Sequence, residues 1–372
     1  MMVMIKGEIK GFCPSNYQEV ADKFLENLNS EEEIGASFTV IQNGKLIIDI
    51  HGGFKDKEQT DLWNADTLVG VHSTGKGIIS MLIALLIDQK KLDLDEFVSS
   101  YWPEFKGDGK EEIKVRTLLS HQGGMYAWRE KVHEDDFHNW AYVVELLEKQ
   151  SPLHKPNELI CYHPKTIGFL VGELIRRITK KTIGEFLKEQ ISIPLNVECF
   201  IGTPEVYHDN IATLISAPSL RKAFSDPKNI DEYTLVSFLN PGNRTKTANT
   251  KEYRLAEIPA LNCHSNSKSL AQIYDYFLNS DFISRETFDQ VTSIEVKGED
   301  QVMKRPMQWS PIGFSIGGGK LFGKSNLSFG HTGWGGSMAF ADPENNLSIS
   351  YTMNMLTGSM LGDQRALSLV ET

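Results

Sequence analysis

A serine and a lysine lie three residues apart at Ser73 and Lys76, directly before a long apolar segment of the chain. Residues at this spacing are neighbours on one face of a helix. The start of a helix also offers unpaired N–H groups and positive potential, which stabilise an oxyanion and lower the pKa of a nearby lysine. Because an uncharged lysine can accept a proton from a hydroxyl, the pair indicates a nucleophilic serine at position 73 with Lys76 as its base.

The Ser-x-x-Lys pattern alone does not decide the site, because it recurs elsewhere in the chain, at Ser219/Lys222, Ser225/Lys228 and Ser265/Lys268. The first two of these pairs lie in polar or proline-containing stretches. The third is expected to open a helix with a polar face, where an N-cap serine and a solvated lysine are the ordinary interpretation. A plain N-cap is also the alternative role for Ser73.

The surroundings of Ser73 separate it from these rivals. Apolar residues 68–71 precede it, and residues 75–89 form an almost unbroken apolar run, which predicts a helix buried on every side. Burial there would keep Lys76 uncharged, as a base must be. Gly75 and Gly77 are expected to leave room for a substrate close to the backbone.

The elements that would hold this pair follow an α+β pattern. After a helix over residues 16–29, two strands are expected over 36–42 and 45–51, joined by a turn at Asn43-Gly44. Short β-rich segments come near the C-terminus, over residues 312–316, 327–330, 337–341 and 347–353, with a turn at 342–346. Helices are expected between the two sets of strands, over 140–149, 166–178, 183–190 and, with Ser265 as N-cap, 265–278.

This order predicts one antiparallel sheet built from both ends of the chain and flanked by helices, with a mainly helical lobe inserted. Residues 1–75 and 262–372 are expected to form the sheet lobe, and residues 76–261 the helical lobe. The active site is expected in the cleft between the two lobes.

Composition and charge disfavour several classes of protein. Lysine and arginine total 38 against 49 acidic residues, a net charge of −11 that would repel nucleic acid or an anionic membrane. No apolar run reaches the roughly 20 residues that span a bilayer, and the first residues lack a signal-peptide core. The cysteines and histidines have no metal-ligand spacing. We therefore expect reduced thiols, a cytoplasmic location, no metal, no cofactor and a small-molecule substrate as partner, with the oligomeric state undetermined.

Two further motifs fail on their context. Residues 318–325 satisfy the phosphate-loop formula, but an extended run is expected after them where that formula requires a helix. Ser337 sits in a near match to the GxSxG elbow, yet it precedes an expected strand and no histidine follows it. Neither a nucleotide site nor an α/β-hydrolase elbow is expected.

Several segments together resemble a known family. They are residues 68–77, 92–95, 101–105, 117–125, 162–174, 330–336 and 341–343. In this order they are similar to the class C β-lactamase-related serine hydrolases, and most similar to the family VIII carboxylesterases. The resemblance runs from about residue 34 to the C-terminus, and it implies the β-lactamase/transpeptidase-like α+β fold.

The resemblance also implies roles for individual residues. Ser73 would form an acyl-enzyme and Lys76 would activate it, while Tyr162 would share proton transfer and serve the leaving group. His331-Thr332-Gly333 stands where β-lactamases carry Lys-Thr-Gly on the strand that lines the cleft, and the backbone N–H of Trp334 would complete an oxyanion hole with that of Ser73. Without the resemblance, Tyr162 would be a core tyrosine at the start of a helix and Trp334 an aromatic residue in a turn.

Two departures from the β-lactamase pattern bear on the substrate. Pro164 replaces a polar amide that contacts the amide side chain of a β-lactam, and His331 replaces a lysine that holds its carboxylate. A neutral histidine pairs poorly with an anion. The leading hypothesis is therefore an esterase for short or medium acyl esters. Its alternatives are an amide hydrolase for D-amino peptides or weak β-lactam turnover, and a catalytically inactive scaffold protein.

Overall fold

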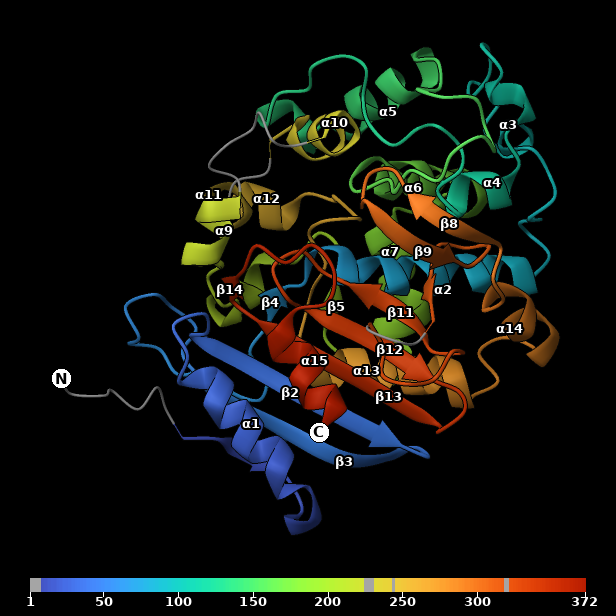
Figure 1. Cartoon of the computed structure of the whole chain (residues 1–372). Coiled ribbons are helices and arrows are strands. Elements are labelled where there is room, and N and C mark those ends of the chain that lie inside the picture. Colours follow the sequence, from blue (N-terminus) through green and yellow to red (C-terminus); the bar gives the residue numbers. More distant parts are fainter. Residues whose placement is uncertain (1–7, 224–230, 243–244, 318–320) are drawn as a thin grey trace.

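The computed structural model describes residues 8–223, 231–242, 245–317 and 321–372. Within these ranges, strands from both ends of the chain form a nine-stranded sheet in the order β1-β3-β2-β13-β12-β11-β10-β9-β8 (Figure 1). The N-terminal strands are β1 (Lys10–Phe12), β2 (Gly35–Gln42) and β3 (Lys45–Gly53). The C-terminal strands are β8 (Val296–Asp300), β9 (Arg305–Trp309), β10 (Ser315–Ile316), β11 (Phe329–Thr332), β12 (Met338–Asp342) and β13 (Leu347–Met353). Every pair in this sheet is antiparallel, which confirms the predicted fold class.

The two halves of the sheet join where β2 pairs with β13, from Gln42 opposite Leu347 to Ala36 opposite Met353. The predicted hairpin turn at Asn43 and Gly44 is confirmed, since both residues have positive φ, 52° and 72°. The β8–β9 hairpin was not predicted. Its first strand, Val-Lys-Gly-Glu-Asp, is polar and lies at the edge of the sheet, so it carries no apolar alternation.

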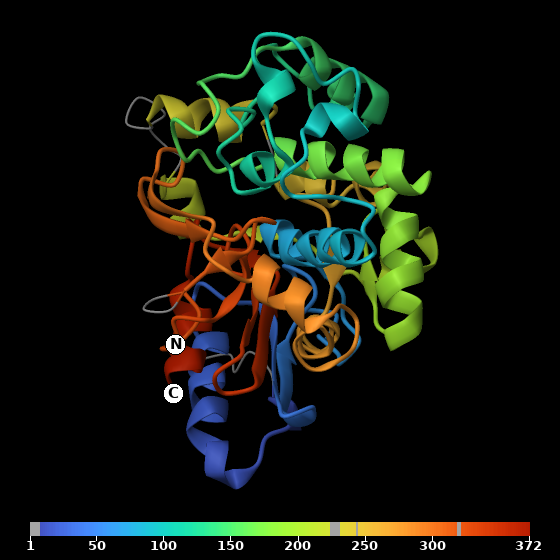
Figure 2. The same cartoon turned by 90° about the vertical axis from the view of Figure 1, so that its right-hand side faces the viewer.

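Helices cover both faces of the sheet. Helix α13 (Ser267–Asn279) packs on β2, β12 and β13, while α1 (Gln18–Leu28) and α15 (Gln364–Glu371) pack together on the other side (Figure 2). The N-cap of α13 is Asn266, whose side chain accepts the N–H of Ser269, so the prediction of Ser265 as cap is wrong. Ser265 instead ends the short strand β7 (His264–Ser265), and its hydroxyl donates to the carbonyl of Glu198.

Helix α2 (Gly75–Asp88) lies between the sheet and the helical part of the chain. It contacts β11 on one side and α6 (Thr166–Thr179) on another, and residues 75–86 are all buried. Burial on every side explains why this helix is apolar all round, as predicted.

The remaining elements lie mainly in the middle of the chain. Helices α5 (Trp140–Lys149) and α6 match the prediction, while α7 (Ile183–Leu187) ends early in a π-helical turn over Lys188–Ser192. The other helices are α3 (Val98–Tyr101), α4 (Val115–Leu119), α8 (Ile193–Leu195), α9 (Pro218–Ala223), α10 (Glu232–Leu239), α11 (Thr245–Ala248), α12 (Lys251–Leu255) and α14 (Arg285–Val291). Small sheets pair β4 (Val69–Gly70) and β5 (Cys199–Phe200) with β7, and β6 (Ile215–Ser216) with β14 (Met355–Leu356).

The described ranges contain neither a membrane-spanning helix nor a cluster of metal-ligating side chains. None of their helices is both long enough and apolar enough to cross a bilayer. Nor do three or more of their His, Cys, Asp or Glu side chains gather as a metal site would require. The first three residues of the rejected phosphate-loop motif, 318–320, lie outside the described residues, and the segment after it leads into β11.

Candidate active site

Ser73 lies in a 3-10 turn, His72–Thr74, that leads directly into α2, and Lys76 lies in the first turn of that helix. The Lys76 Nζ atom is 2.6 Å from the Ser73 Oγ atom, 2.9 Å from the carbonyl oxygen of Pro164 and 3.1 Å from that of Ala260. Complete burial lowers the pKa of Lys76 well below its usual value. An uncharged amine has two N–H groups for the two carbonyls, which leaves its lone pair for the Ser73 hydroxyl proton.

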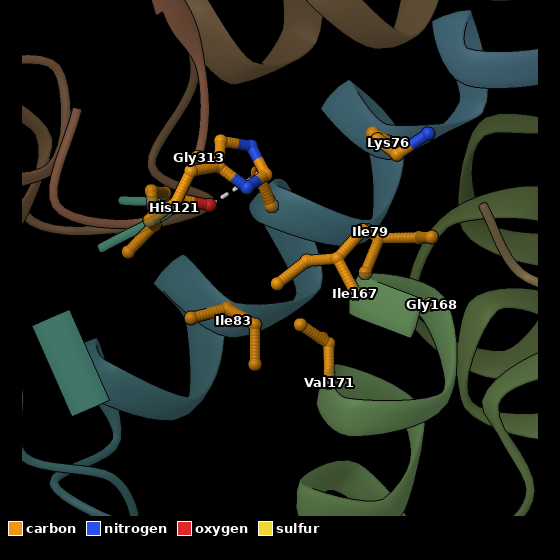
Figure 3. Close-up of a pocket in the computed structure, with 10 residues that line it drawn as sticks. Lys76, Ile79, Ile83, His121, Ile167, Gly168, Val171 and Gly313 are labelled. Atoms are coloured by element: carbon orange, nitrogen blue, oxygen red, sulfur yellow. Dashed lines mark hydrogen bonds between the residues drawn. The ribbon is translucent and has the colours of Figure 1, made fainter. Parts of the chain in front are cut away.

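The wall behind Lys76 accounts for this desolvation. A cavity of about 20 Å³, room for a single water molecule, lies beside the lysine (Figure 3). Isoleucines 79 and 83 of α2 line it together with Ile167 and Val171 of α6. These branched side chains offer no acceptor to an ammonium group, and the polar side chains that share the lining, Ser80 and the neutral His121, carry no negative charge to pair with it.

Tyr162 joins the pair from the loop before α6. Its phenol interacts with the Ser73 hydroxyl, and its ring centre lies 5.1 Å from the Lys76 Nζ atom. Burial raises the pKa of Tyr162, so the phenol keeps its proton at neutral pH. Ser73, Lys76 and Tyr162 therefore lie together, with one hydroxyl beside an amine and a phenol.

The end of strand β11 forms the facing wall. The Ser337 hydroxyl donates to the carbonyl of Val71 at 2.8 Å and lies 2.9 Å from the Thr74 Oγ1 atom, which ties this wall to the Ser73 turn. The His331 Nδ1–H group donates to the carbonyl of Thr332 at 2.7 Å. The pKa of His331 is lowered to about 3, mainly by burial and to a smaller extent by the nearby Lys76. His331 is therefore neutral. The position at which β-lactamases carry a lysine thus holds no positive charge in this protein.

The comparison with known proteins settles the family. The Beta-lactamase family model matches residues 20–371. The chain belongs to the beta-lactamase family. Among solved structures it is similar to a family VIII carboxylesterase, with a TM-score of 0.90 and 31% identity over 98% of both chains. It is also similar to a penicillin-binding protein homolog from Caulobacter crescentus, with a TM-score of 0.89 and 30% identity over 98% of both chains.

A curated relative points the same way. The chain is 26% identical to the esterase/beta-lactamase LipL of Mycobacterium tuberculosis over 88% of this chain and 78% of LipL. These matches confirm the predicted resemblance and the β-lactamase/transpeptidase-like fold. The protein is thus a serine hydrolase of the beta-lactamase family.

The pocket of this beta-lactamase-family hydrolase opens onto Ser73. It is lined by Ser73, Tyr162, Phe238, Met303, Trp309, His331, Thr332, Trp334, Met360 and Leu361. Its volume of about 20 Å³ is small, and none of the described side chains that line it is charged. The lining contains five apolar residues that sequence reasoning missed, namely Phe238, Met303, Trp309, Met360 and Leu361. They come from separate loops and short elements. Only Trp309 could have been found from the sequence, because it alternates with the buried Met307 along β9.

The rival Ser-x-x-Lys pairs are arranged differently. The Ser265 hydroxyl donates to a backbone carbonyl, while Lys268 forms an ion pair with Asp49 at 3.4 Å on the surface. Ser219 donates to the carboxylate of Glu32. Ser225 and Lys228 lie outside the described residues.

The predicted role of Gly75 and Gly77 is wrong. A Cβ atom at Gly75 would lie 2.4 Å from the Cβ of Cys263, and one at Gly77 would lie 1.9 Å from the phenol oxygen of Tyr274. The space beside both glycines is thus filled by the protein itself. They allow α2 to pack closely against its neighbours and leave no room for a substrate.

Gly333 makes an equally close contact at the site, and this gives a testable prediction. A Cβ atom at Gly333 would lie 2.3 Å from the carbonyl oxygen of Val71 and 2.1 Å from the Ser337 Oγ atom. We expect Gly333→Ala to push β11 away from the Ser73 turn, lowering stability by about 1–3 kcal/mol. Hydrolysis should fall by about tenfold or more, since small misplacements of reacting groups are costly. Thermal melting and esterase assays test this; unchanged melting temperature and turnover would contradict the close packing of β11 on that turn.

Proposed function

We propose that this hydrolase cleaves uncharged carboxylic esters through an acyl-enzyme on Ser73. The observation that carries the proposal is the buried contact of 2.6 Å between the Lys76 Nζ and Ser73 Oγ atoms. In the first half-reaction, Lys76 takes the Ser73 proton while the Oγ atom attacks the ester carbonyl. The Tyr162 phenol donates its proton to the departing alkoxide and regains one from the Lys76 ammonium.

The second half-reaction returns the enzyme to its starting state. A water molecule attacks the acyl carbon and gives its proton to the Tyr162 and Lys76 pair, and Ser73 recovers a proton as the carboxylic acid leaves. In both halves the carbonyl oxygen gains negative charge, which the backbone N–H groups of Ser73 and Trp334 would stabilise. Both residues line the same pocket, which supports this placement.

The lining of the pocket favours a neutral substrate. His331 is uncharged, and within the described part of the chain none of the lining residues is a lysine or arginine that could pair with a carboxylate. Pro164 directs its carbonyl to Lys76, so its backbone serves the base. An ester substrate also agrees with the names of two similar proteins, a family VIII carboxylesterase and the esterase/beta-lactamase LipL.

An amide or β-lactam substrate is the second candidate, favoured by the similarity to a penicillin-binding protein homolog. Intact-mass spectrometry after brief exposure to p-nitrophenyl acetate, p-nitrophenyl butyrate or nitrocefin separates the two. We expect an acyl adduct from the esters, mapped to the peptide that contains Ser73. An adduct from nitrocefin with none from the esters would favour the second candidate, and no adduct from any of them would favour an inactive scaffold.

We further propose the two-lobe division at residues 75/76 and 261/262, with the site at the boundary, since the sheet takes strands from both ends of the chain. A cytoplasmic location stays a prediction.

The size of the acyl group should depend on Phe238, the pocket residue contributed by α10. We expect Phe238→Ala to raise the ratio of kcat/KM for p-nitrophenyl octanoate over acetate by about tenfold, because each added methylene gains apolar contact in the enlarged pocket. Leu239→Ala is the matched control, since the next side chain of the same helix is 45% exposed. An unchanged ratio in Phe238→Ala would place the acyl chain elsewhere.

A further inference from the structure

The β8–β9 hairpin carries a buried acid beside the site, Asp300, whose residue is fully shielded from solvent. Its Oδ1 atom accepts three backbone N–H groups, from Tyr162 at 3.1 Å, Val302 at 2.9 Å and Met303 at 3.0 Å. Its Oδ2 atom accepts the indole N–H of Trp309 at 3.4 Å. Among the described residues no lysine or arginine forms an ion pair with this carboxylate. A buried acid held by N–H groups alone is costly, which points to a use beyond stability.

Three successive backbone N–H groups around Tyr162 are each taken by an acceptor. The N–H of Cys161 donates to the carbonyl of His121 at 2.9 Å, that of Tyr162 to Asp300, and that of His163 to the His121 Nδ1 atom at 3.2 Å. The loop before α6 is therefore held on both sides, by the His121 turn and by the β8–β9 hairpin. The conformation of the Tyr162 backbone is fixed by these bonds.

Aromatic neighbours hold the Tyr162 ring, and two of them lie closer to it than His331 does. Trp309 stacks on it with ring centres 5.5 Å apart and planes within 5°, and His121 meets its edge at 5.0 Å. Asp300 accepts both the Tyr162 N–H and the Trp309 indole N–H. One carboxylate therefore fixes the position of the tyrosine backbone and that of the indole ring on which the tyrosine ring stacks. The direction of the phenol toward Ser73 follows from these two constraints.

We propose that Asp300 is a positioning residue for acyl transfer, holding the Tyr162 phenol in line with the Ser73 hydroxyl through the Tyr162 backbone and the Trp309 ring. This inference rests on the proposed role of Tyr162 in proton transfer. Charge-assisted bonds to the carboxylate are shorter and stronger than bonds to a neutral acceptor, so an acid is suited to this task. Asp300 is not among the described residues that line the pocket, so its action would pass through Tyr162 and Trp309.

The first test compares two isosteric substitutions. Asp300→Asn keeps one amide oxygen, which can still accept the backbone N–H groups. The second carboxylate oxygen becomes an NH₂ group, which cannot accept the indole N–H of Trp309. Asp342→Asn is the matched control, since Asp342 is also buried and accepts the N–H groups of Glu344 and Asn345 in the β12–β13 turn. We expect kcat for p-nitrophenyl acetate to fall by about 10- to 100-fold in Asp300→Asn and by less than about twofold in the control. Equal effects in the two variants would overturn the proposal.

A double-mutant cycle with Tyr162→Phe separates positioning from a merely structural role. If Asp300 acts through the phenol, adding Asp300→Asn to Tyr162→Phe should lower kcat by less than about a further threefold, because the group being positioned is already gone. Losses that multiply in full would show that Asp300 acts on the fold alone and would overturn the proposal. Near-normal turnover in Tyr162→Phe itself would contradict the proposed function, and the inference with it.

A second variant keeps the proposal testable if Asp300→Asn does not fold. Trp309→Phe retains an aromatic ring against Tyr162 and removes the N–H group that Asp300 accepts. We expect kcat to fall by about fivefold, and again with little further loss in the Tyr162→Phe background. Unchanged kcat in Trp309→Phe would overturn the claim that the carboxylate acts through the indole.

Discussion

Ser73→Ala is expected to lower ester hydrolysis by about ten-thousand-fold or more, because the acyl group then has no atom to which it can bind. Folding should be unaffected, since the change removes one oxygen at the start of α2 and Lys76 keeps its bonds to the carbonyls of Pro164 and Ala260. The measurements are kcat/KM for p-nitrophenyl acetate and the melting temperature. The variant should also fail to react with a fluorophosphonate probe.

The control for this experiment is Ser265→Ala, which removes the serine of another Ser-x-x-Lys pair. Its hydroxyl binds only backbone carbonyls, chiefly that of Glu198, in the described part of the chain. Hydrolysis should persist in this variant even if it melts at a lower temperature. Ester turnover that survives in Ser73→Ala and disappears in Ser265→Ala would move the nucleophile and refute the assigned site.

Lys76→Ala is expected to lower hydrolysis by about a thousandfold to a hundred-thousandfold, since the Ser73 hydroxyl loses its base. The dependence on pH gives this prediction a sign. Burial lowers the pKa of Lys76, so the amine is a base above that pKa and a useless ammonium below it. Wild-type kcat/KM should therefore fall as the pH falls through this pKa, and the same decline should be absent from the residual activity of Lys76→Ala.

Two further lysine variants sharpen this result. Lys76→Arg places an always charged guanidinium at the site and should remain inactive even at high pH. Lys268→Ala removes a surface lysine that pairs with Asp49, and its activity should match the wild type. Near-normal turnover in Lys76→Arg would show that this position supplies no base.

Local patterns predicted the parts of the structure that local physics determines. The apolar run of α2 could be stable only inside the protein, and Asn43-Gly44 has few conformations besides a hairpin turn. The three residues Ser73, Lys76 and Tyr162 come together in the structure, although the link to Tyr162 came from resemblance to a family. The N-cap was misplaced by one residue, because Ser265 and Asn266 offer the same chemistry and only the pairing of β7 distinguishes them.

What sequence reasoning missed depends on contacts between distant segments. Asp300 and Tyr162 are 138 residues apart, and an acid in the segment Gly298-Glu299-Asp300 has the pattern of a solvated edge strand. Its burial arises only when the hairpin folds over the Tyr162 loop. The glycines of α2 were misinterpreted for a similar reason, since Cys263 and Tyr274, which fill the space beside them, lie far along the chain.

Titration of Lys76 by NMR, in protein carrying ¹³C at the lysine ε-carbons, tests most directly whether an uncharged amine stands beside the serine. The resonance is assigned by its absence from Lys76→Arg, which also distinguishes it from buried Lys165, whose pKa burial lowers to about 7. We predict that Lys76 titrates well below the ordinary lysine value of 10.5 and is uncharged at the pH of maximal turnover. A lysine that stays protonated there and titrates with the surface lysines would contradict the account.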